Sequence, residues 1–166
     1  MKKYFNILVF PILAFLAFRY FSNDPRKEIE KLITEAARKA SFEGQAQPIE
    51  AAFYAKEILN FATEDLHLLG HTDQGDHAVQ GIKEIRPGLI TARTKLDQLA
   101  VHVKDFKIEL TSQDKATAQL VIRGMGKEPG RTDYFLEEHP ILLKLTKSQG
   151  QWLIYYGENS DKLVTK

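Results

Sequence analysis

Two histidines and two aspartates lie within seven consecutive residues, His71-Thr72-Asp73-Gln74-Gly75-Asp76-His77. Imidazole and carboxylate groups can bind a divalent cation or exchange protons with a substrate, provided that they converge on one point. The spacing alone does not bring the two imidazoles together. His71 and His77 are six residues apart, whereas adjacent residues on one face are two apart on a strand and four apart on a helix. Gly75 and Asp76 are typical of a turn, and Asp76 can cap a following helical turn. The stretch therefore predicts a solvated loop, with a site for a cation or a polar ligand at His71, Asp73, Asp76 and His77 as the alternative.

Four further side chains are candidates for contact with a ligand. The hydroxyl groups of Tyr54, Tyr134 and Tyr156 could serve a cavity, although core packing alone accounts for most aromatic residues. In the strand expected around it, His139 lies on the same face as the apolar residues. Glutamates precede it, so an imidazole–carboxylate pair is conceivable there. Pro140 next to it favours a bulge or an edge instead. If a ligand binds, we expect it at Tyr54, Tyr134, His139 and Tyr156.

The composition sets limits on the class of protein. The 166-residue chain is long enough for one domain and a short appendage. It has no cysteine, which excludes disulfides, thiol nucleophiles and cysteine-bound metals. Residues 24–166 carry a formal charge of −2, because three of the 23 basic residues precede Asp24 and none of the 22 acidic residues does. This balance gives no electrostatic basis for nucleic-acid binding, and no pattern indicates a cofactor.

The first 23 residues predict a membrane anchor. Lys2 and Lys3 precede an apolar run over residues 5–18 that only Asn6 and Pro11 interrupt. Flanking aromatic residues can lengthen this run toward a spanning helix, and the small residues that a cleavage site needs are missing. We therefore expect residues 1–23 to form an uncleaved single-pass anchor, with a cleaved signal peptide as the alternative. The layout of an export signal favours an extracytoplasmic, periplasmic location for residues 24–166, although Arg19, Arg26, Lys27 and Lys31 lie just beyond the apolar run.

Helical periodicity predicts three helices in the first part of the domain. Asp24 is a plausible N-cap for the first helix, Pro25 fits its first position, and Pro48 begins the second helix. Pro87 predicts a kink or a restart in the third helix. The expected bounds are 25–41, 48–62 and 81–99 for the helices and 64–70 for a first, short strand. The second helix is expected to pack through Ile49, Ala52, Phe53, Leu59 and Ala62.

The apolar period changes from about 3.6 to 2 near residue 99, which predicts strands. The expected strands cover residues 99–111, 115–126, 133–147 and 150–158. In the first of them the apolar residues occupy one parity up to Val103 and the other parity from Phe106 onward. A parity switch at Lys104-Asp105 is what a β-bulge produces, since it bends a strand so that both halves face the core.

The order of these elements, with the segments HAVQGIKEIRPGLI, DKATAQLVIRG and ILLKLTKSQGQWLIYYGE, resembles the nuclear transport factor 2-like superfamily, which includes the polyketide-cyclase-like proteins. The resemblance covers residues 26 to about 160. It implies one domain, residues 24–166, with an α+β cone: a curved antiparallel sheet covered by about three N-terminal helices. It also implies a pocket between sheet and helices, homodimers through the outer sheet face, and the histidine–aspartate stretch at the rim of the cone.

Members of this superfamily include isomerases, cyclases, dehydratases and proteins that only bind or assemble. The ketosteroid isomerases pair an aspartate base with a tyrosine, which sits on the first helix, and with a protonated acid. Residues 25–41 contain no tyrosine, and the apolar parities of the strands carry no aspartate. We therefore expect a membrane-anchored, non-catalytic module that binds a protein partner or an apolar small molecule. A small-molecule isomerase, cyclase or dehydratase that uses the cone pocket is the alternative.

Overall fold

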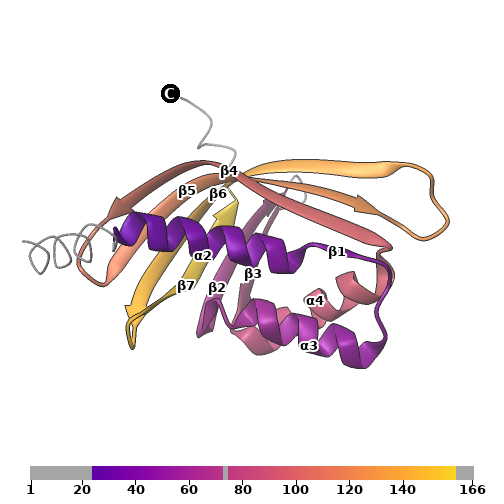
Figure 1. Ribbon diagram of the computed structural model, residues 1–166, viewed down its shortest axis with the longest axis horizontal. Helices are drawn as coiled ribbons and strands as arrows, with labels where there is room; N and C mark the ends of the chain where they lie inside the picture. The colour runs from indigo at the N-terminus through magenta and orange to yellow at the C-terminus, as the bar shows by residue number, and fades with distance from the viewer. Residues whose placement is uncertain (1–23, 73–74, 160–166) are drawn as a thin grey trace, which may run out of the picture.

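A computed structural model describes residues 24–72 and 75–159. Within these residues, three helices and a curved seven-stranded sheet form an α+β fold, as the sequence predicts (Figure 1). The strands lie in the order β1-β4-β5-β6-β7-β2-β3. Along the chain the elements are α2 (Pro25–Ala40), β1 (Phe42–Glu43), α3 (Pro48–Leu59), β2 (Ala62–Thr72), β3 (Gly75–Gln80), α4 (Ile82–Lys95), β4 (Gln98–Leu110), β5 (Lys115–Lys127), β6 (Tyr134–Ser148) and β7 (Gln151–Asn159).

The sheet is mixed, which corrects the expectation of an antiparallel sheet. β2 pairs in parallel with β7, with His67 opposite Tyr156 and Leu69 opposite Glu158, whereas the other neighbouring strands are antiparallel. Alternation of apolar residues indicates a strand but not its partner, and most of the domain separates these two strands in sequence. The parallel pair places the end of β2 beside the end of the last strand.

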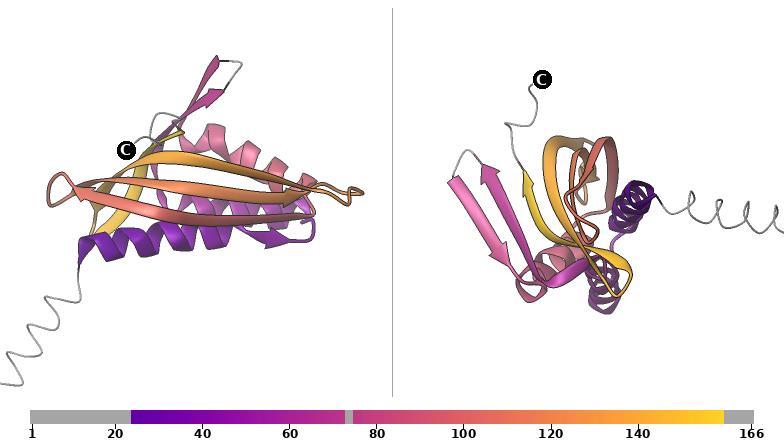
Figure 2. Two further views of the ribbon diagram at one scale, coloured as in Figure 1. Left: turned by 90° about the horizontal axis from the view of Figure 1, so that it is seen from above. Right: turned by 90° about the vertical axis from the view of Figure 1, so that its left-hand side faces the viewer.

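The described part of the histidine–aspartate stretch lies in a β-hairpin, so the prediction of a loop is wrong. β2 extends to Thr72 and β3 begins at Gly75, with His71 paired to Asp76 and Gly70 paired to His77. The hairpin projects beyond the rest of the sheet, at the edge most distant from α2 (Figure 2). β3 is almost entirely exposed, and an exposed polar strand lacks the apolar alternation from which strands are predicted.

The first two helices begin where the sequence predicts. The Asp24 side chain accepts a hydrogen bond from the backbone N–H of Arg26 at 3.0 Å, and Pro25 occupies the first helical position. α2 buries Ile29, Ile33 and Ala37, which recur at helical spacing along one face.

The face predicted for α3 is wrong except at Leu59. The helix buries Ala51, Ala55 and Leu59, whereas Ile49 is 74% exposed and Phe53 is 65% exposed. Alanine lets the helix pack closely, so the small side chains face inward and two large apolar side chains remain in solvent. α4 ends at Lys95, four residues earlier than predicted, and is a single helix through Pro87.

The core lies between α2 and one face of strands β4 to β7. Its buried residues include Ile29 and Ile33 from α2 and Leu143 and Leu145 from β6, with Trp152 from β7. The sequence-based prediction of a bulge in β4 is confirmed. The β4–β5 register shifts between Lys104 and Lys107, and Asp105 has a φ of +57°. Residues of both parities, Val103, Phe106 and Ile108, consequently pack against the same core.

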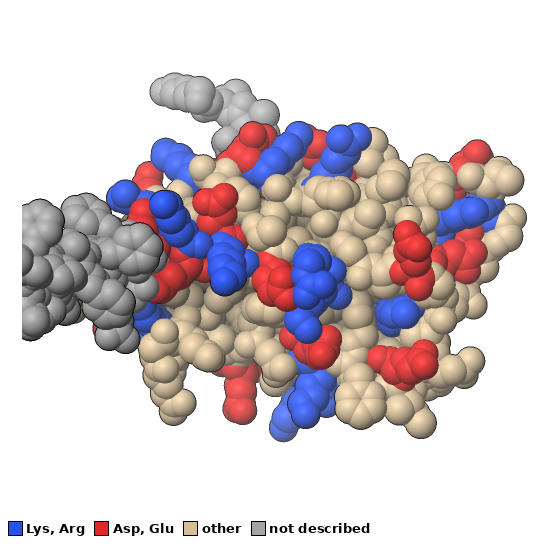
Figure 3. All heavy atoms as spheres, in the orientation of Figure 1, with Lys and Arg blue, Asp and Glu red and all other residues tan. Residues whose placement is uncertain are grey.

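Charged side chains of both signs are interspersed over the molecular face that carries α2 (Figure 3). Among the described residues, no helix is both long enough and apolar enough to cross a membrane. The anchor expected at residues 1–23 lies outside the described residues.

Candidate functional site

The polar groups of interest lie on the outer face, which we define as the sheet face opposite the α2 core. Core residue Leu143 pairs with Gly157, and a Cβ atom added to Gly157 would come within 2.9 Å of the Leu68 side chain and 3.3 Å of the Leu143 side chain. Leu68, Leu143 and Gly157 therefore share the core face, and their neighbours point the other way, because side chains alternate along a strand. The outer face thus carries His67, Leu69 and His71 from β2, Asp76 and Ala78 from β3, Leu142 and Lys144 from β6, and Tyr156 and Glu158 from β7.

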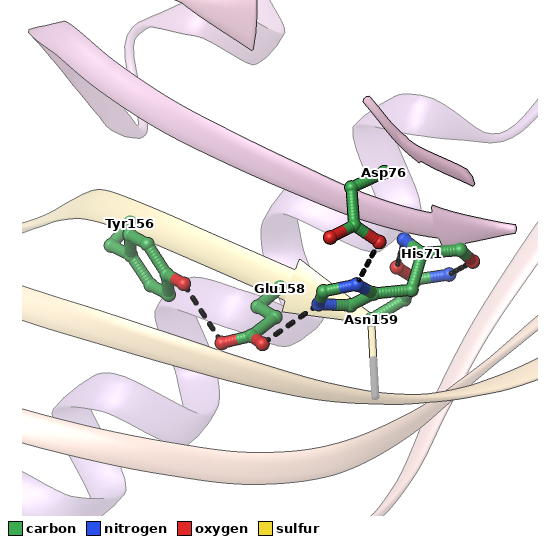
Figure 4. Close-up of polar contacts among 5 residues, drawn as sticks. All are labelled: His71, Asp76, Tyr156, Glu158 and Asn159. Carbon is green, nitrogen blue, oxygen red and sulfur yellow. Dashed lines mark hydrogen bonds and ion pairs between the residues drawn. The ribbon is translucent and has the colours of Figure 1, made fainter. Parts of the chain in front are cut away.

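Four of these side chains form a continuous series of hydrogen bonds, which we call the polar chain (Figure 4). The Tyr156 hydroxyl donates to Glu158 Oε2 at 2.8 Å. The other Glu158 oxygen, Oε1, lies 2.9 Å from His71 Nε2, and His71 Nδ1 lies 2.7 Å from Asp76 Oδ1. Both ring nitrogens of one imidazole therefore face carboxylates that come from different strands.

The two carboxylates favour the protonated form of His71. Its pKa is raised, first by the hydrogen bond to Glu158 and then by the hydrogen bond to Asp76, while partial desolvation acts in the opposite direction. The pKa of Glu158 is lowered, mainly by the hydrogen bonds from His71 and from Tyr156. Desolvation raises the pKa of the Tyr156 hydroxyl, and its bond to Glu158 adds to this effect. These contacts favour an imidazolium that donates to two carboxylates, with the Tyr156 hydroxyl bonded to Glu158 behind it.

Asn159 holds the backbone of His71 in place. Its side-chain oxygen accepts a hydrogen bond from the His71 N–H at 2.6 Å, and its side-chain nitrogen donates to the His71 carbonyl at 3.0 Å. These two bonds join the end of β7 to the end of β2, where the parallel pairing reaches only to Leu69 and Glu158. The two hydrogen bonds from the Asn159 amide therefore fix the backbone position from which the His71 imidazole contacts Glu158.

The polar chain has the composition of an acid–base site. An imidazolium can donate a proton to a substrate oxygen, and a carboxylate beside it can accept one. Exposure differs along the chain: the side chain of Glu158 is 24% exposed, that of His71 35%, and that of Asp76 69%. Glu158 and Tyr156 thus hold the ring from the sheet side, whereas Asp76 is the open end that a ligand can reach.

The other residues of the histidine–aspartate stretch do not join the polar chain. His77 pairs with Gly70, so its position alternates with that of Asp76 and faces the opposite side of β3. Asp73 lies outside the described residues. Within residues 24–72 and 75–159, no group of three or more histidine, aspartate or glutamate side chains is arranged to hold a metal ion.

Of the four predicted ligand contacts, Tyr156 alone lies in the polar chain. The Tyr54 hydroxyl donates to the Ala40 carbonyl at the end of α2 at 2.7 Å, and burial raises its pKa to about 12. Tyr134 is half exposed and donates to Gln98 Oε1 at 3.3 Å. His139 lies 3.4 Å from Glu137, on the sheet face opposite His71 according to its pairing with Ile122. The structure does not bring these three residues together with Tyr156.

Sequence reasoning missed Glu158 and Asn159. Tyr156 and Glu158 are two residues apart in a predicted strand, so their common face could have been inferred. Their proximity to His71 could not, because it depends on the parallel pairing of β2 with β7. The signal that was present, a tyrosine and a glutamate on one strand face, is too common to indicate a site by itself.

A separate hollow of about 510 Å³ lies between α2, the start of β2 and the β6–β7 turn. Its lining includes Glu28, Leu32 and Trp152 and no residue of the polar chain. Glu28 accepts hydrogen bonds from Trp152 Nε1 at 3.2 Å and from Lys147 Nζ at 3.3 Å. These contacts occupy the Glu28 carboxylate within the fold.

No family model matches the chain, and no curated protein matches it in sequence. Solved structures do match the fold. A proposed scytalone dehydratase from Novosphingobium aromaticivorans superposes with a TM-score of 0.67 at 14% identity, over 80% of each chain. A nuclear transport factor 2-like protein with a cystatin-like fold from the same organism gives 0.62 at 15% identity, over 87% of this chain and 86% of the other. A type 2 hexachlorocyclohexane dehydrochlorinase gives 0.59 at 11% identity, over 82% and 84%. The chain therefore has the nuclear transport factor 2-like fold.

Proposed function

We propose that the protein is a small-molecule enzyme of the dehydratase or isomerase kind, in which His71 and Asp76 transfer protons. The observation that carries this proposal is the polar chain, in which one imidazole is held between two carboxylates and backed by Tyr156. The Asp76 side chain, at one end of the polar chain, is 69% exposed and is therefore accessible to a ligand. This reading replaces the non-catalytic module expected from the sequence, for which the polar chain offers no support.

The names of two structural neighbours fit the same class of chemistry. A dehydratase removes water and a dehydrochlorinase removes hydrogen chloride, so both names denote eliminations. At their low identity to this chain they support the fold, and the assignment of chemistry rests on His71 and Asp76.

The geometry suits the elimination of water from a β-hydroxy carbonyl compound. Asp76 accepts the proton from the carbon next to the carbonyl group, a carbon–carbon double bond forms, and His71 donates its Nδ1 proton to the departing hydroxyl group, which leaves as water. The proton on Asp76 then returns to His71 across their 2.7 Å contact, which restores both groups. Glu158, itself hydrogen-bonded to Tyr156, keeps the imidazole in position and favours its protonated form between turnovers.

Turnover of a substrate panel by matched histidine variants tests the proposal. The full-length chain, purified in detergent, is incubated with β-hydroxy ketones of increasing size, and enone formation is followed by its absorbance. We expect His71→Gln to reduce the rate by about 10²- to 10⁴-fold, the usual contribution of a positioned acid or base. His77→Gln, on the other side of the same hairpin, should keep the wild-type rate. Equal rates for the wild type and His71→Gln, or no turnover of any compound by the wild type, would contradict the proposal.

We also propose that residues 1–23 anchor the protein in a membrane as a single-pass segment, with the domain outside the cytoplasm, because of their apolar run.

A homodimer through the β4–β6 part of the outer face is a further proposal. It is supported by the apolar side chains of Val121, Pro140 and Leu142, which share that face and are partly exposed there in the single chain. Such a dimer would leave the polar chain at its margin. Sedimentation of the wild type and of Val121→Arg tests it, since the charge should shift a dimer to monomer.

A further inference from the structure

A second group of side chains lies beside the polar chain on the outer face, in a row that crosses three strands. We call Lys144 of β6, Tyr156 of β7 and His67 of β2 the lysine row, because Lys144 pairs with Tyr156 and Tyr156 pairs with His67. The Lys144 Nζ lies 4.6 Å from the centre of the Tyr156 ring, and the His67 ring meets the same ring edge-on at 5.7 Å. One aromatic ring is therefore flanked by an ammonium group and an imidazole.

Lys144 differs in its partners from Lys104 and Lys147, two lysines of the sheet that pair with carboxylates. Lys104 pairs with Glu138 at 2.9 Å and Lys147 pairs with Glu28 at 3.3 Å. Among the described residues, no carboxylate forms an ion pair with Lys144, whose ammonium group rests on the Tyr156 ring instead. Its positive charge nevertheless acts on the polar chain, because it contributes to the lowered pKa of Glu158.

We propose that the lysine row binds the carboxylate of a substrate whose reacting carbonyl group lies at His71. This inference rests on the proposed function and names its substrate class, an elongated hydroxy or keto acid. An ammonium group without a partner provides a charge-assisted hydrogen bond to a carboxylate. A phosphate would call for the backbone N–H groups that phosphate sites supply, and on a sheet face those groups point along the ladder rather than toward the ligand.

The spacing of the two sites sets the length of the substrate. His67 and His71 are four residues apart on β2, which corresponds to roughly 13 Å along a strand. Between them, the next row of the outer face offers Leu69 and Leu142, both half-buried, on either side of Glu158. The substrate would therefore have an anionic end at Lys144, an apolar middle part over these leucines, and a carbonyl end at His71 and Asp76.

Binding of small aromatic probes by the full-length chain in detergent micelles tests the lysine row. Benzoate carries the carboxylate, benzyl alcohol is its neutral counterpart, and phenyl phosphate carries the competing anion; binding is followed by NMR chemical-shift titration. We expect benzoate to bind and benzyl alcohol not to bind. Lys144→Gln should weaken benzoate binding about fivefold, as for the loss of one exposed charge pair, and Lys144→Arg should retain it.

Lys127→Gln is the matched control, because Lys127 lies over the ring of Tyr134 at 5.8 Å on the same sheet but far from the polar chain. Unchanged benzoate binding in a folded Lys144→Gln variant would overturn the proposal, and tighter binding of phenyl phosphate than of benzoate would overturn the carboxylate assignment. The proposed function fails separately: benzoate binding that depends on Lys144, without any proton transfer that depends on His71, would refute the enzyme and leave the lysine row in place.

Discussion

Truncation of Val103 and of Phe106 tests whether the bulge in β4 turns both halves of this strand toward one core. Both side chains pack against the core although they are three positions apart, because the register shifts between Lys104 and Lys107. A straight strand would place the two side chains on opposite faces, so that only one truncation would affect folding. The bulge predicts that both alanine variants lose stability.

The magnitudes follow from the burial of the two side chains. Full burial of a phenylalanine corresponds to a loss of about 3–5 kcal/mol on truncation to alanine. Phe106 is only partly buried, so we expect about 2–3 kcal/mol for Phe106→Ala. For Val103→Ala, which removes two methyl groups from a partly buried site, we expect about 1–2 kcal/mol. At about 3 °C per kcal/mol for a domain of this size, the Tm should fall by roughly 6–9 °C and 3–6 °C respectively.

Thermal and urea unfolding of the full-length chain measure these losses. His102→Ala is the control, because His102 is exposed and lies next to Val103 on the other side of the strand; its Tm should stay within about 1 °C of the wild type. An unchanged Tm for Phe106→Ala, together with a shift from dimer to monomer on a sizing column, would refute the bulge and assign Phe106 to an interface.

Three further changes have defined outcomes. Tyr54→Phe removes the 2.7 Å hydrogen bond to the Ala40 carbonyl, and urea unfolding should show a loss of about 1 kcal/mol, with an unchanged midpoint as the contrary result. Asp105→Val places a β-branched residue at a φ of +57° and should lower stability by about 1–2 kcal/mol, whereas Asp105→Gly should not; equal stability of the two variants would contradict this. Membrane fractionation with intact-mass measurement should find the full chain in the membrane fraction, and a soluble product that lacks about 20 residues would show a cleaved signal peptide instead.

The parts of the fold that depend on local pattern could be predicted from the sequence. Asp24 and Pro25 define the start of α2, and the parity change after Val103 indicates the bulge, because each depends on neighbouring residues. The buried face of α3 could not be predicted in the same way. A hydrophobic pattern treats Phe53 as a core residue, yet the space against α4 and the sheet admits Ala51 and Ala55 and leaves Phe53 outside.

Three of the five residues of the candidate site could be predicted from the sequence. His71, Asp76 and Tyr156 were singled out for their chemistry, but in two unrelated groups, one in an expected loop and one in an expected strand. The parallel pairing of β2 with β7 joins the groups and adds Glu158 and Asn159. The packing of the whole sheet decides which strands pair over a long sequence separation. Residue spacing carries no information about this packing.

The pKa of His71 shows directly whether Glu158 and Asp76 hold its imidazole in the polar chain. The imidazole ¹⁵N signals of the full-length chain are followed through a pH titration of the wild type and of Glu158→Gln. We expect the wild-type ring to stay doubly protonated above its ordinary pKa of about 6.5, and Glu158→Gln to lower the pKa because it removes the larger of the two causes. The raised pKa sets the pH dependence of both stability and activity. The stabilisation of the fold by His71 is complete below pH 6.5 and is lost as the pH rises through the raised folded-state pKa. Proton donation by His71 declines over the same pH interval. A wild-type pKa at or below 6.5, or a Glu158→Gln variant with an unchanged pKa, would contradict the account.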